Sequence, residues 1–177
     1  MSFKPTEPGA GQPRQSPAGV RVRTAEIADL PAVVALERAT ETAPHWAEAE
    51  YTAILSPTGG HPTGVQRRLW VAESSDGTIA GFSVGKLLLA GGTVEAELES
   101  VAVAECARRQ GVGRVLCGAM LAWAREHGAG TVELEVRASS DGAVSLYRAL
   151  GFTPEGRRPM YYQHPADDAL RMIASVR

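Results

Sequence analysis

The stretch RRQGVGR, residues 108–114, decides how the fold is interpreted, because two sequence periodicities meet there. Residues 94–103 (VEAELESVAV) precede it and alternate between apolar and polar side chains, as a half-buried strand does. After it, apolar residues recur at every third or fourth position up to Gly128, which predicts a long amphipathic helix. The stretch is therefore predicted to be a tight glycine turn that joins a strand to the start of a helix.

The remaining segments show the same two periodicities. Alternation predicts further strands at 20–24, 67–74, 78–89 and 131–138 and within 152–162 and 169–176, and helical spacing predicts helices at 29–39, 47–55 and 141–150. The passage from 94 to 138 should hold two parallel strands with a right-handed crossover, whereas short turns make the other sequential strands antiparallel. We expect one α/β (α+β) domain with a mixed, mostly antiparallel central sheet of about seven strands, a parallel central pair and about four flanking helices.

Composition excludes several classes of protein. The 177 residues, 44% of them hydrophobic, suffice for one domain that buries its own core. A formal net charge of -2 argues against nucleic-acid binding. Residues 1–19 are rich in proline and glycine and lack an apolar run of signal-peptide length, so we expect a flexible tail before a domain at 20–177. With no apolar run long enough to span a membrane, a soluble, cytoplasmic protein is expected.

The two cysteines, Cys106 and Cys117, form neither a disulfide framework nor a metal-ligand spacing, so we expect reduced thiols and no metal. Cys106 closely follows the strand at 94–103, where a thiol could act as a nucleophile. However, the sequence offers no evident base to pair with this thiol.

The common nucleotide motifs do not fit the glycine turn. A dinucleotide fingerprint requires a glycine where the chain has Leu116, and a P-loop requires lysine and a hydroxyl residue where it has Ala119 and Met120. What remains is the start of a helix, with unpaired backbone N–H groups, glycines that permit close approach and three arginines. Such a turn suits a pyrophosphate, although a structural turn with solvated arginines fits the same residues.

The neighbouring sequence favours the ligand-binding alternative. Residues 108–113 (RRQGVG) fit the pattern Arg/Gln-x-x-Gly-x-Gly/Ala that opens the long helix of the GCN5-related N-acetyltransferase (GNAT) superfamily. LEVRASS (134–140) followed by AVSLYRALGF (143–152) resembles the signature of its ribosomal-protein-alanine N-acetyltransferases, the RimI type. YYQHPADDALRM (161–172) and TAPHW (42–46) are similar to further elements of that type. The resemblance covers almost all of the predicted domain.

The resemblance implies acetyl-CoA as the acetyl donor. It also implies direct attack by the amine in a ternary complex, without an acetyl-cysteine intermediate on Cys106. In this superfamily the pyrophosphate rests on the turn, while main-chain groups of the preceding strand hold the acetyl carbonyl and the pantetheine arm. Ser140 stands where the family signature has asparagine, so its contact with the arm is less secure. The residues that the resemblance assigns to the donor are Val101, Ala102, Val103, Arg108, Arg109, Gln110, Gly111, Val112, Gly113, Arg114, Ser140 and Tyr147.

Acetyl transfer to an amine requires a base for the amine and a proton for the departing thiolate. Glu97 and Glu99 share one face of a predicted strand, and Glu133 and Glu135 share one face of another. If the strands are parallel neighbours, the four carboxylates line one cleft, although Glu97 and Glu133 also suit a solvated face. The resemblance implies that Glu135 is the base, with Glu99 in reserve.

The same resemblance implies that Tyr147 lies near the thioester sulfur and is the general acid that protonates the departing thiolate. The alternative is that its ring only packs in the core. Tyr161 and Tyr162 resemble the pair that borders the peptide groove, although two aromatic residues in a strand also suit ordinary sheet packing. Trp46 or His45 is expected to reach the same groove, although His45 fits a surface histidine better. The implied acceptor is the N-terminal α-amine of a protein, such as the alanine of a ribosomal protein. The alternatives are a small-molecule amine or a regulatory module that binds acetyl-CoA without catalysis.

Overall fold

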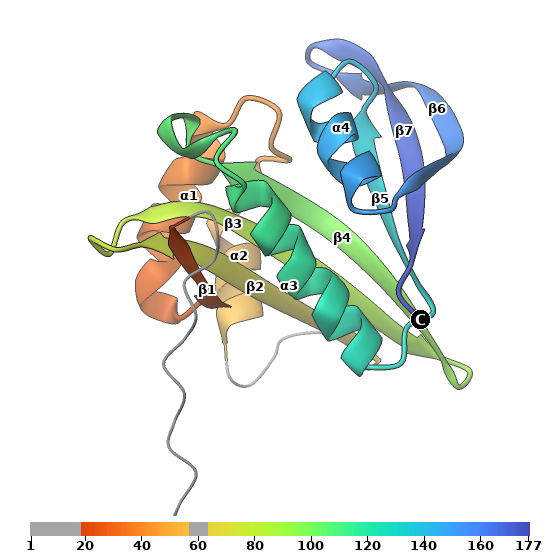
Figure 1. Cartoon of the computed structure of the whole chain (residues 1–177), viewed down its shortest axis with the longest axis horizontal. Helices are drawn as coiled ribbons and strands as arrows, with labels where there is room; N and C mark the ends of the chain where they lie inside the picture. The colour runs from red at the N-terminus through yellow and green to blue at the C-terminus, as the bar shows by residue number, and fades with distance from the viewer. Residues whose placement is uncertain (1–18, 57–63) are drawn as a thin grey trace, which may run out of the picture.

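The computed structural model describes residues 19–56 and 64–177, which form a single seven-stranded sheet covered by helices on both faces (Figure 1). The predicted tail lies outside the described residues except for Gly19, and so do the prolines and glycines at 57–63. The strands are β1 (Val20–Thr24), β2 (Val65–Ser74), β3 (Ile79–Ala90), β4 (Thr93–Val103), β5 (Thr131–Arg137), β6 (Thr153–Gln163) and β7 (Ala166–Ser175). The α-helices of the described part are α1 (Leu30–Ala39), α2 (Glu48–Leu55), α3 (Val112–Glu126) and α4 (Asp141–Ala149).

The strand order is β1-β2-β3-β4-β5-β7-β6, and β4 with β5 is the parallel pair, so the predicted mixed sheet is confirmed. The parallel pairing covers only Ala96 with Val132 and Glu97 with Glu133. Beyond these two pairs the strands diverge, as the opening between β4 and β5 in Figure 1 shows. The C-terminal half of β4 therefore presents its main chain toward this opening.

A bulge in β4 accompanies the divergence. Val84 in β3 pairs with Ser100 and Gly85 pairs with Leu98, so Glu99 is the extra residue. A bulge bends its strand, increases the local twist and exchanges the faces to which later side chains point. Accordingly Leu98 packs beneath α3, whereas Ala102 packs in the cluster on the α1 and α2 side. The bulge thus reverses the face of the sheet to which each side chain after Glu99 points.

The two helical layers bury separate apolar clusters. In Figure 1, α3 crosses in front of β2 to β4, whereas α1 and α2 lie behind them. Leu116 and Met120 of α3 are fully buried against the sheet. Gly81 and Gly85 in β3 allow this close packing, because a Cβ on Gly85 would lie 2.7 Å from Cγ of Met120. No helix of the described ranges, 19–56 and 64–177, has both the length and the hydropathy that crossing a membrane requires.

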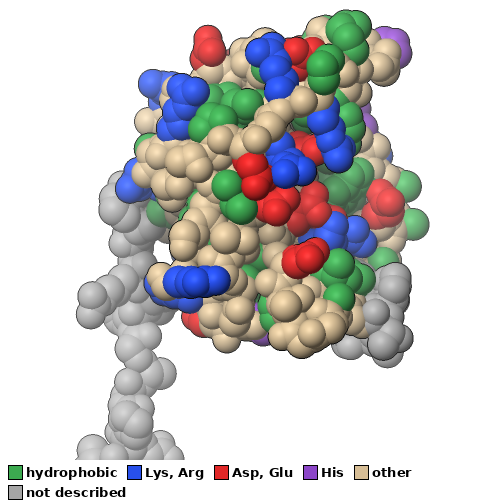
Figure 2. Space-filling view, turned by 90° about the vertical axis from the view of Figure 1, so that its right-hand side faces the viewer, with side chains coloured by type: hydrophobic (Ala, Val, Ile, Leu, Met, Phe, Trp, Pro, Cys, Tyr) green, Lys and Arg blue, Asp and Glu red, His purple; other side chains and the backbone are tan. Residues whose placement is uncertain are grey.

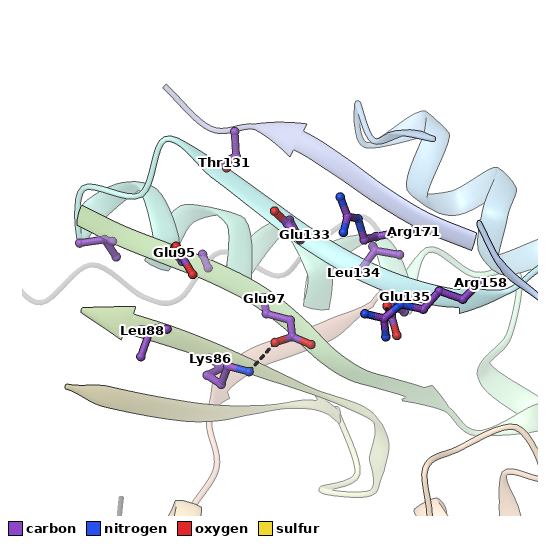
Figure 3. Close-up of a pocket in the computed structure, with 12 residues that line it drawn as sticks. Lys86, Leu88, Glu95, Glu97, Thr131, Glu133, Leu134, Glu135, Arg158 and Arg171 are labelled. Carbon is purple, nitrogen blue, oxygen red and sulfur yellow. Dashed lines mark hydrogen bonds and ion pairs between the residues drawn. The ribbon is translucent and has the colours of Figure 1, made fainter. Parts of the chain in front are cut away.

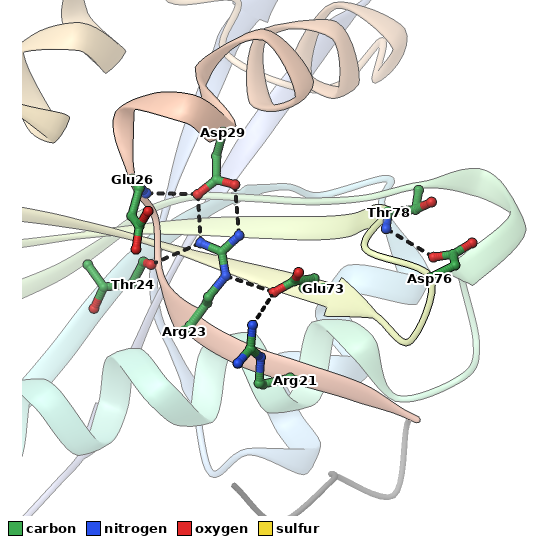
Figure 4. A network of polar contacts seen from close by, with 8 residues as sticks. All are labelled: Arg21, Arg23, Thr24, Glu26, Asp29, Glu73, Asp76 and Thr78. Carbon is green, nitrogen blue, oxygen red and sulfur yellow. Dashed lines mark hydrogen bonds and ion pairs between the residues drawn. The ribbon is translucent and has the colours of Figure 1, made fainter.

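An ion-pair network fastens the edge strand β1 (Figure 4). Arg23 donates to both carboxylate oxygens of Asp29, at 2.7 and 2.8 Å, and its Nε donates to Glu73 in β2 at 2.8 Å. Glu73 also accepts from Arg21 at 2.7 Å. The Arg23 guanidinium is the main cause that lowers the pKa of Asp29. The network joins β1, β2 and the start of α1 on the side of the sheet remote from β5.

Candidate active site

The glycine turn lies beside a cleft of about 480 Å³, called here the α3 cleft. Gly111 has φ +87° and stands at the N-cap of α3, where no side chain caps the helix. The residues around this cleft come from the end of β4, the turn, the start of α3 and α4, and they include Val101, Val103, Arg108, Arg109, Gly111, Val112, Gly113, Arg114, Leu146 and Tyr147. The start of a helix, with unpaired N–H groups and arginines around it, provides a site for an anion.

Gly113 has a packing role that its place in the motif did not indicate. A Cβ there would lie 3.0 Å from Cδ2 of Leu146 in α4 and 3.7 Å from Cγ2 of Val103. The absence of a side chain therefore lets Leu146 of α4 approach the first turn of α3. Gln110 has a local contact as well, since its Nε2 donates to the carbonyl of Cys106 at 2.7 Å.

A second cleft of about 860 Å³, the central cleft, lies in the opening between β4 and β5. Its walls come from the α1–α2 loop, from β4 after the bulge, from β5, from α4 and from the end of the β6–β7 hairpin. Residues around it include Glu41, His45, Glu99, Val101, Glu135, Arg137, Ser140, Tyr147, Tyr161, Tyr162 and His164. Ser140 thus borders the central cleft, whereas it is not among the residues around the α3 cleft.

Tyr147 of α4 borders both clefts, as do Val101 and Ala143. Its ring packs edge-on against Phe152, with centroids 5.8 Å apart. Burial is the main cause that raises the pKa of the Tyr147 phenol above its ordinary value. The phenol is therefore protonated throughout the neutral range, as a proton donor must be.

The two candidate bases have different surroundings. The Glu99 side chain is 8% exposed and accepts two hydrogen bonds from Arg67, at 2.7 and 2.8 Å, while Lys86 lies 3.5 Å away. The Glu135 side chain is 23% exposed, and its ion-pair partner is Nη1 of the exposed Arg158 at 3.0 Å. Glu135 is thus the more accessible and the less neutralised carboxylate of the two.

The four predicted carboxylates do not line one cleft. Glu97 and Glu133 border a separate cleft of about 300 Å³ at strands β3, β4 and β5. In this cleft Glu97 forms an ion pair with Lys86 (Figure 3). Glu135 borders this cleft as well as the central cleft. The basic residues Lys86, Arg158 and Arg171 border the same cleft. Glu97 and Glu133 therefore fit the solvated-face alternative. Figure 2 shows acidic and basic side chains intermixed on one side of the molecule.

The aromatic residues predicted for the acceptor occupy different places. Tyr161 and Tyr162 both border the central cleft, with ring centroids 5.1 Å apart. Burial, and next the charge of Glu135, raise the pKa of Tyr162. Trp46 instead packs on Tyr51, with centroids 5.5 Å apart, and is not among the residues around the cleft. His45, which the sequence offered as the alternative, does border it.

A buried carboxylate that the sequence did not single out shapes the α1–α2 wall. Glu37 is fully buried in α1, and its Oε1 accepts the backbone N–H of Trp46 at 3.0 Å. Its Oε2 accepts from Arg38 at 2.9 Å, and Arg38 also donates to the carbonyl of Trp46 at 2.7 Å. These contacts fasten the end of the loop that carries His45. The place of Glu37 four residues after Val33, on the apolar face of the predicted helix, is the signal that could have identified it.

The cysteines lie away from both clefts. Cys106 is exposed and Cys117 is buried, and burial raises the pKa of the Cys117 thiol to about 12. Neither residue is among those that border the α3 or central cleft. In the described parts of the chain, no group of three or more His, Cys, Asp or Glu side chains is arranged to hold a metal ion.

Comparison with known proteins agrees with this arrangement. Residues 31–152 match the model of the acetyltransferase (GNAT) family. The chain is 32% identical over 141 residues to the ribosomal protein bS18-alanine N-acetyltransferase of Escherichia coli, covering 80% of this chain and 86% of that protein. It is 33% identical over 127 residues to the N-alpha-acetyltransferase RimI of Mycobacterium tuberculosis, covering 72% and 73%.

A crystal structure of the ribosomal-protein alanine N-acetyltransferase from Escherichia coli superposes with a TM-score of 0.70 at 27% identity, covering 89% of this chain and 94% of that one. The family model extends from α1 to the end of α4, so it includes strands β2 to β5, the glycine turn and the helix that carries Tyr147. The chain therefore belongs to the acetyltransferase (GNAT) family and is an N-acetyltransferase.

Proposed function

We propose that the protein transfers the acetyl group of acetyl-CoA directly to the N-terminal α-amine of a protein, with alanine at the N-terminus of a ribosomal protein as the first candidate. The observation that carries the proposal is that the α3 cleft and the central cleft share Val101, Ala143 and Tyr147. A donor in one cleft and an acceptor in the other would meet at Tyr147. The relatives named for N-terminal acetylation support the choice of acceptor.

The α3 cleft suits a pyrophosphate and a thioester arm. The N-terminal N–H groups of α3 are not capped by a side chain, and Gly111 keeps the turn open to a ligand. Arg108, Arg109 and Arg114 add positive charge around the phosphates. The main chain of Val101 and Val103, on the divergent half of β4, would hold the arm and the acetyl carbonyl. Acetyl-CoA supplies the activated acetyl group, as a thioester whose carbonyl carbon accepts the amine.

Glu135 and Tyr147 supply the proton transfers. Glu135 takes a proton from the α-ammonium group, and the neutral nitrogen then forms the C–N bond. As the C–S bond breaks, Tyr147 gives its hydroxyl proton to the departing sulfur, and the phenolate takes up a second proton from the nitrogen, which leaves a neutral amide and the CoA thiol. An α-amine is about 2.5 pKa units easier to deprotonate than a lysine side chain, which corresponds to about 3.5 kcal/mol. A carboxylate such as Glu135 is therefore a sufficient base for this acceptor.

The proposal is tested by the release of CoA thiol when the protein is mixed with acetyl-CoA and peptides that differ in their first residue. Rapid release with Ala-initiated peptides is expected, and mass spectrometry should place the acetyl group on the α-amine. Spermidine and free amino acids serve as competing acceptors. Release with these small amines alone would contradict the proposed acceptor, and binding of acetyl-CoA without any release would indicate a regulatory module.

Replacing Gly111 with valine is expected to raise the Kd for acetyl-CoA by about tenfold or more. The backbone at φ +87° costs a residue with a side chain about 1–2 kcal/mol, so valine should shift the turn away from the conformation that exposes its N–H groups to an anion. Isothermal titration calorimetry measures the change. Gly118→Ala in the middle of α3 is the matched control, because no atom lies within 4 Å of its added Cβ. Equal affinity in Gly111→Val would contradict the placement of the pyrophosphate.

The pH profile of kcat is expected to rise and then stay level up to about pH 10. The base and the amine must lose protons, which gives the rise, whereas Tyr147 must keep its proton. Because burial raises the pKa of Tyr147 above the ordinary value of about 10, its protonated form persists across this range. Steady-state kinetics at saturating peptide provide the measurement. A fall in kcat below pH 9 would mean that another group, with a lower pKa, donates the proton.

A further inference from the structure

The β6–β7 hairpin extends beyond the end of β5. Arg137, the last residue of β5, pairs with Ala169 in β7, and Ala169 pairs with Arg158 in β6. Residues 160–167, called here the hairpin tip, therefore lie past the last β5–β7 pair. This tip carries Tyr161 and Tyr162, which border the central cleft. Contacts other than the β5–β7 ladder must hold the tip in place.

Arg137 makes three contacts with the tip although it is only 9% exposed. Its Nη1 donates to the carbonyl of Pro165 at 2.8 Å, and its Nη2 donates to the carbonyl of His164 at 3.0 Å. Its guanidinium carbon lies 4.1 Å from the centroid of the Tyr162 ring. One side chain thus connects the end of β5 both to the turn of the tip and to an aromatic residue of the cleft.

The chemistry of these contacts is specific for arginine. A buried charge is costly unless its surroundings compensate for it, and here two carbonyls, an aromatic face and a carboxylate do so. The buried Nε of Arg137 has no hydrogen-bond partner in the described part of the chain, so the compensation comes from the two carbonyls, the ring and the charge of Asp167 in the same tip. The pKa of Asp167 is lowered first by the hydrogen bond from Ser139 and also by the charge of Arg137. A planar guanidinium can stack on a ring while it donates to two carbonyls, whereas a lysine ammonium is a single point of charge.

We propose that Arg137 is a positioning residue that fixes the hairpin tip so that Tyr162 faces the acceptor, and that it thereby sets the affinity for the acceptor. The inference rests on the proposed function, because it assigns the tip to the wall of the acceptor site. It does not involve the α3 cleft, which Arg137 does not border. Loss of Arg137 should therefore affect the peptide and leave acetyl-CoA binding as it is.

Kinetics of Arg137→Lys test this role. The KM for the peptide should rise by about tenfold, as loss of the two carbonyl contacts and the stacking would produce, while the KM for acetyl-CoA stays within about twofold. Arg148→Lys, at an exposed position of α4, is the matched control and should change neither constant. In a Tyr162→Ala background, Arg137→Lys should raise the peptide KM by less than about twofold. A full tenfold rise in that background, or an equal rise in the KM for acetyl-CoA, would overturn the inference.

Hydrogen exchange gives a readout that does not need turnover. Backbone amides of residues 160–167 should exchange about tenfold faster in Arg137→Lys than in the wild type, with β2 and β3 unchanged. Unchanged exchange at the tip would overturn the positioning role even if KM rose. If the wild-type protein acetylated no peptide, the proposed function would fail, and the exchange rates would still decide whether Arg137 holds the tip.

Discussion

Replacing Tyr147 with phenylalanine is expected to lower kcat by about 10²- to 10⁴-fold, the usual contribution of a positioned general acid. The substitution removes one hydroxyl and keeps the ring, whose packing on Phe152 is edge-on at 5.8 Å. The fold and the acetyl-CoA Kd should therefore change little. Single-turnover kinetics at saturating acetyl-CoA and peptide measure the chemical step directly.

Two further variants separate the roles in this reaction. Glu135→Gln should lower kcat most at low pH, where little of the amine is neutral, and Glu99→Gln should have a smaller effect because Arg67 and Lys86 already neutralise that carboxylate. If Tyr147→Phe and Glu135→Gln combined left kcat unchanged, both assignments would be wrong. A larger loss in Glu99→Gln than in Glu135→Gln would instead make Glu99 the base.

Replacing Gly85 with valine is expected to lower the free energy of unfolding by about 3 kcal/mol, at the upper end of the cost of overpacking a core. The new Cβ would lie 2.7 Å from Cγ of Met120 and 3.2 Å from Cζ3 of Trp70. Met120 is fully buried, so its side chain has little room to move without displacing α3. Chemical denaturation measures the loss, and the melting temperature should fall by about 10 °C.

The matched control for this substitution is Gly156→Val in β6. Gly156 is also a strand glycine, but no atom lies within 4 Å of its added Cβ. Its free energy of unfolding should change by less than about 0.5 kcal/mol, as at most surface positions. Equal losses in the two variants would mean that strand glycines, and not the contact with Met120, account for the effect.

Local patterns in the sequence were sufficient for the order of the structural elements. Alternation, helical spacing and turn residues act over a few positions, so the glycine turn before α3 and the parallel pair β4–β5 followed from the sequence. The bulge at Glu99 did not, because an extra residue in one strand is defined only by its partner strand. For the same reason the period-two rule could not predict that Glu99 borders the central cleft without Glu97, which borders a different one.

By itself, the sequence determined the fold class, the glycine turn and the resemblance that identified the family, since these depend on residues close together along the chain. Only the tertiary structure decided that Glu135 is more accessible than Glu99, that Trp46 packs on Tyr51 and that Arg137 donates to two carbonyls of the hairpin tip. Each of these depends on burial and on contacts between residues distant in sequence. Such contacts set the charge, exposure and direction of a side chain, and no local pattern encodes them.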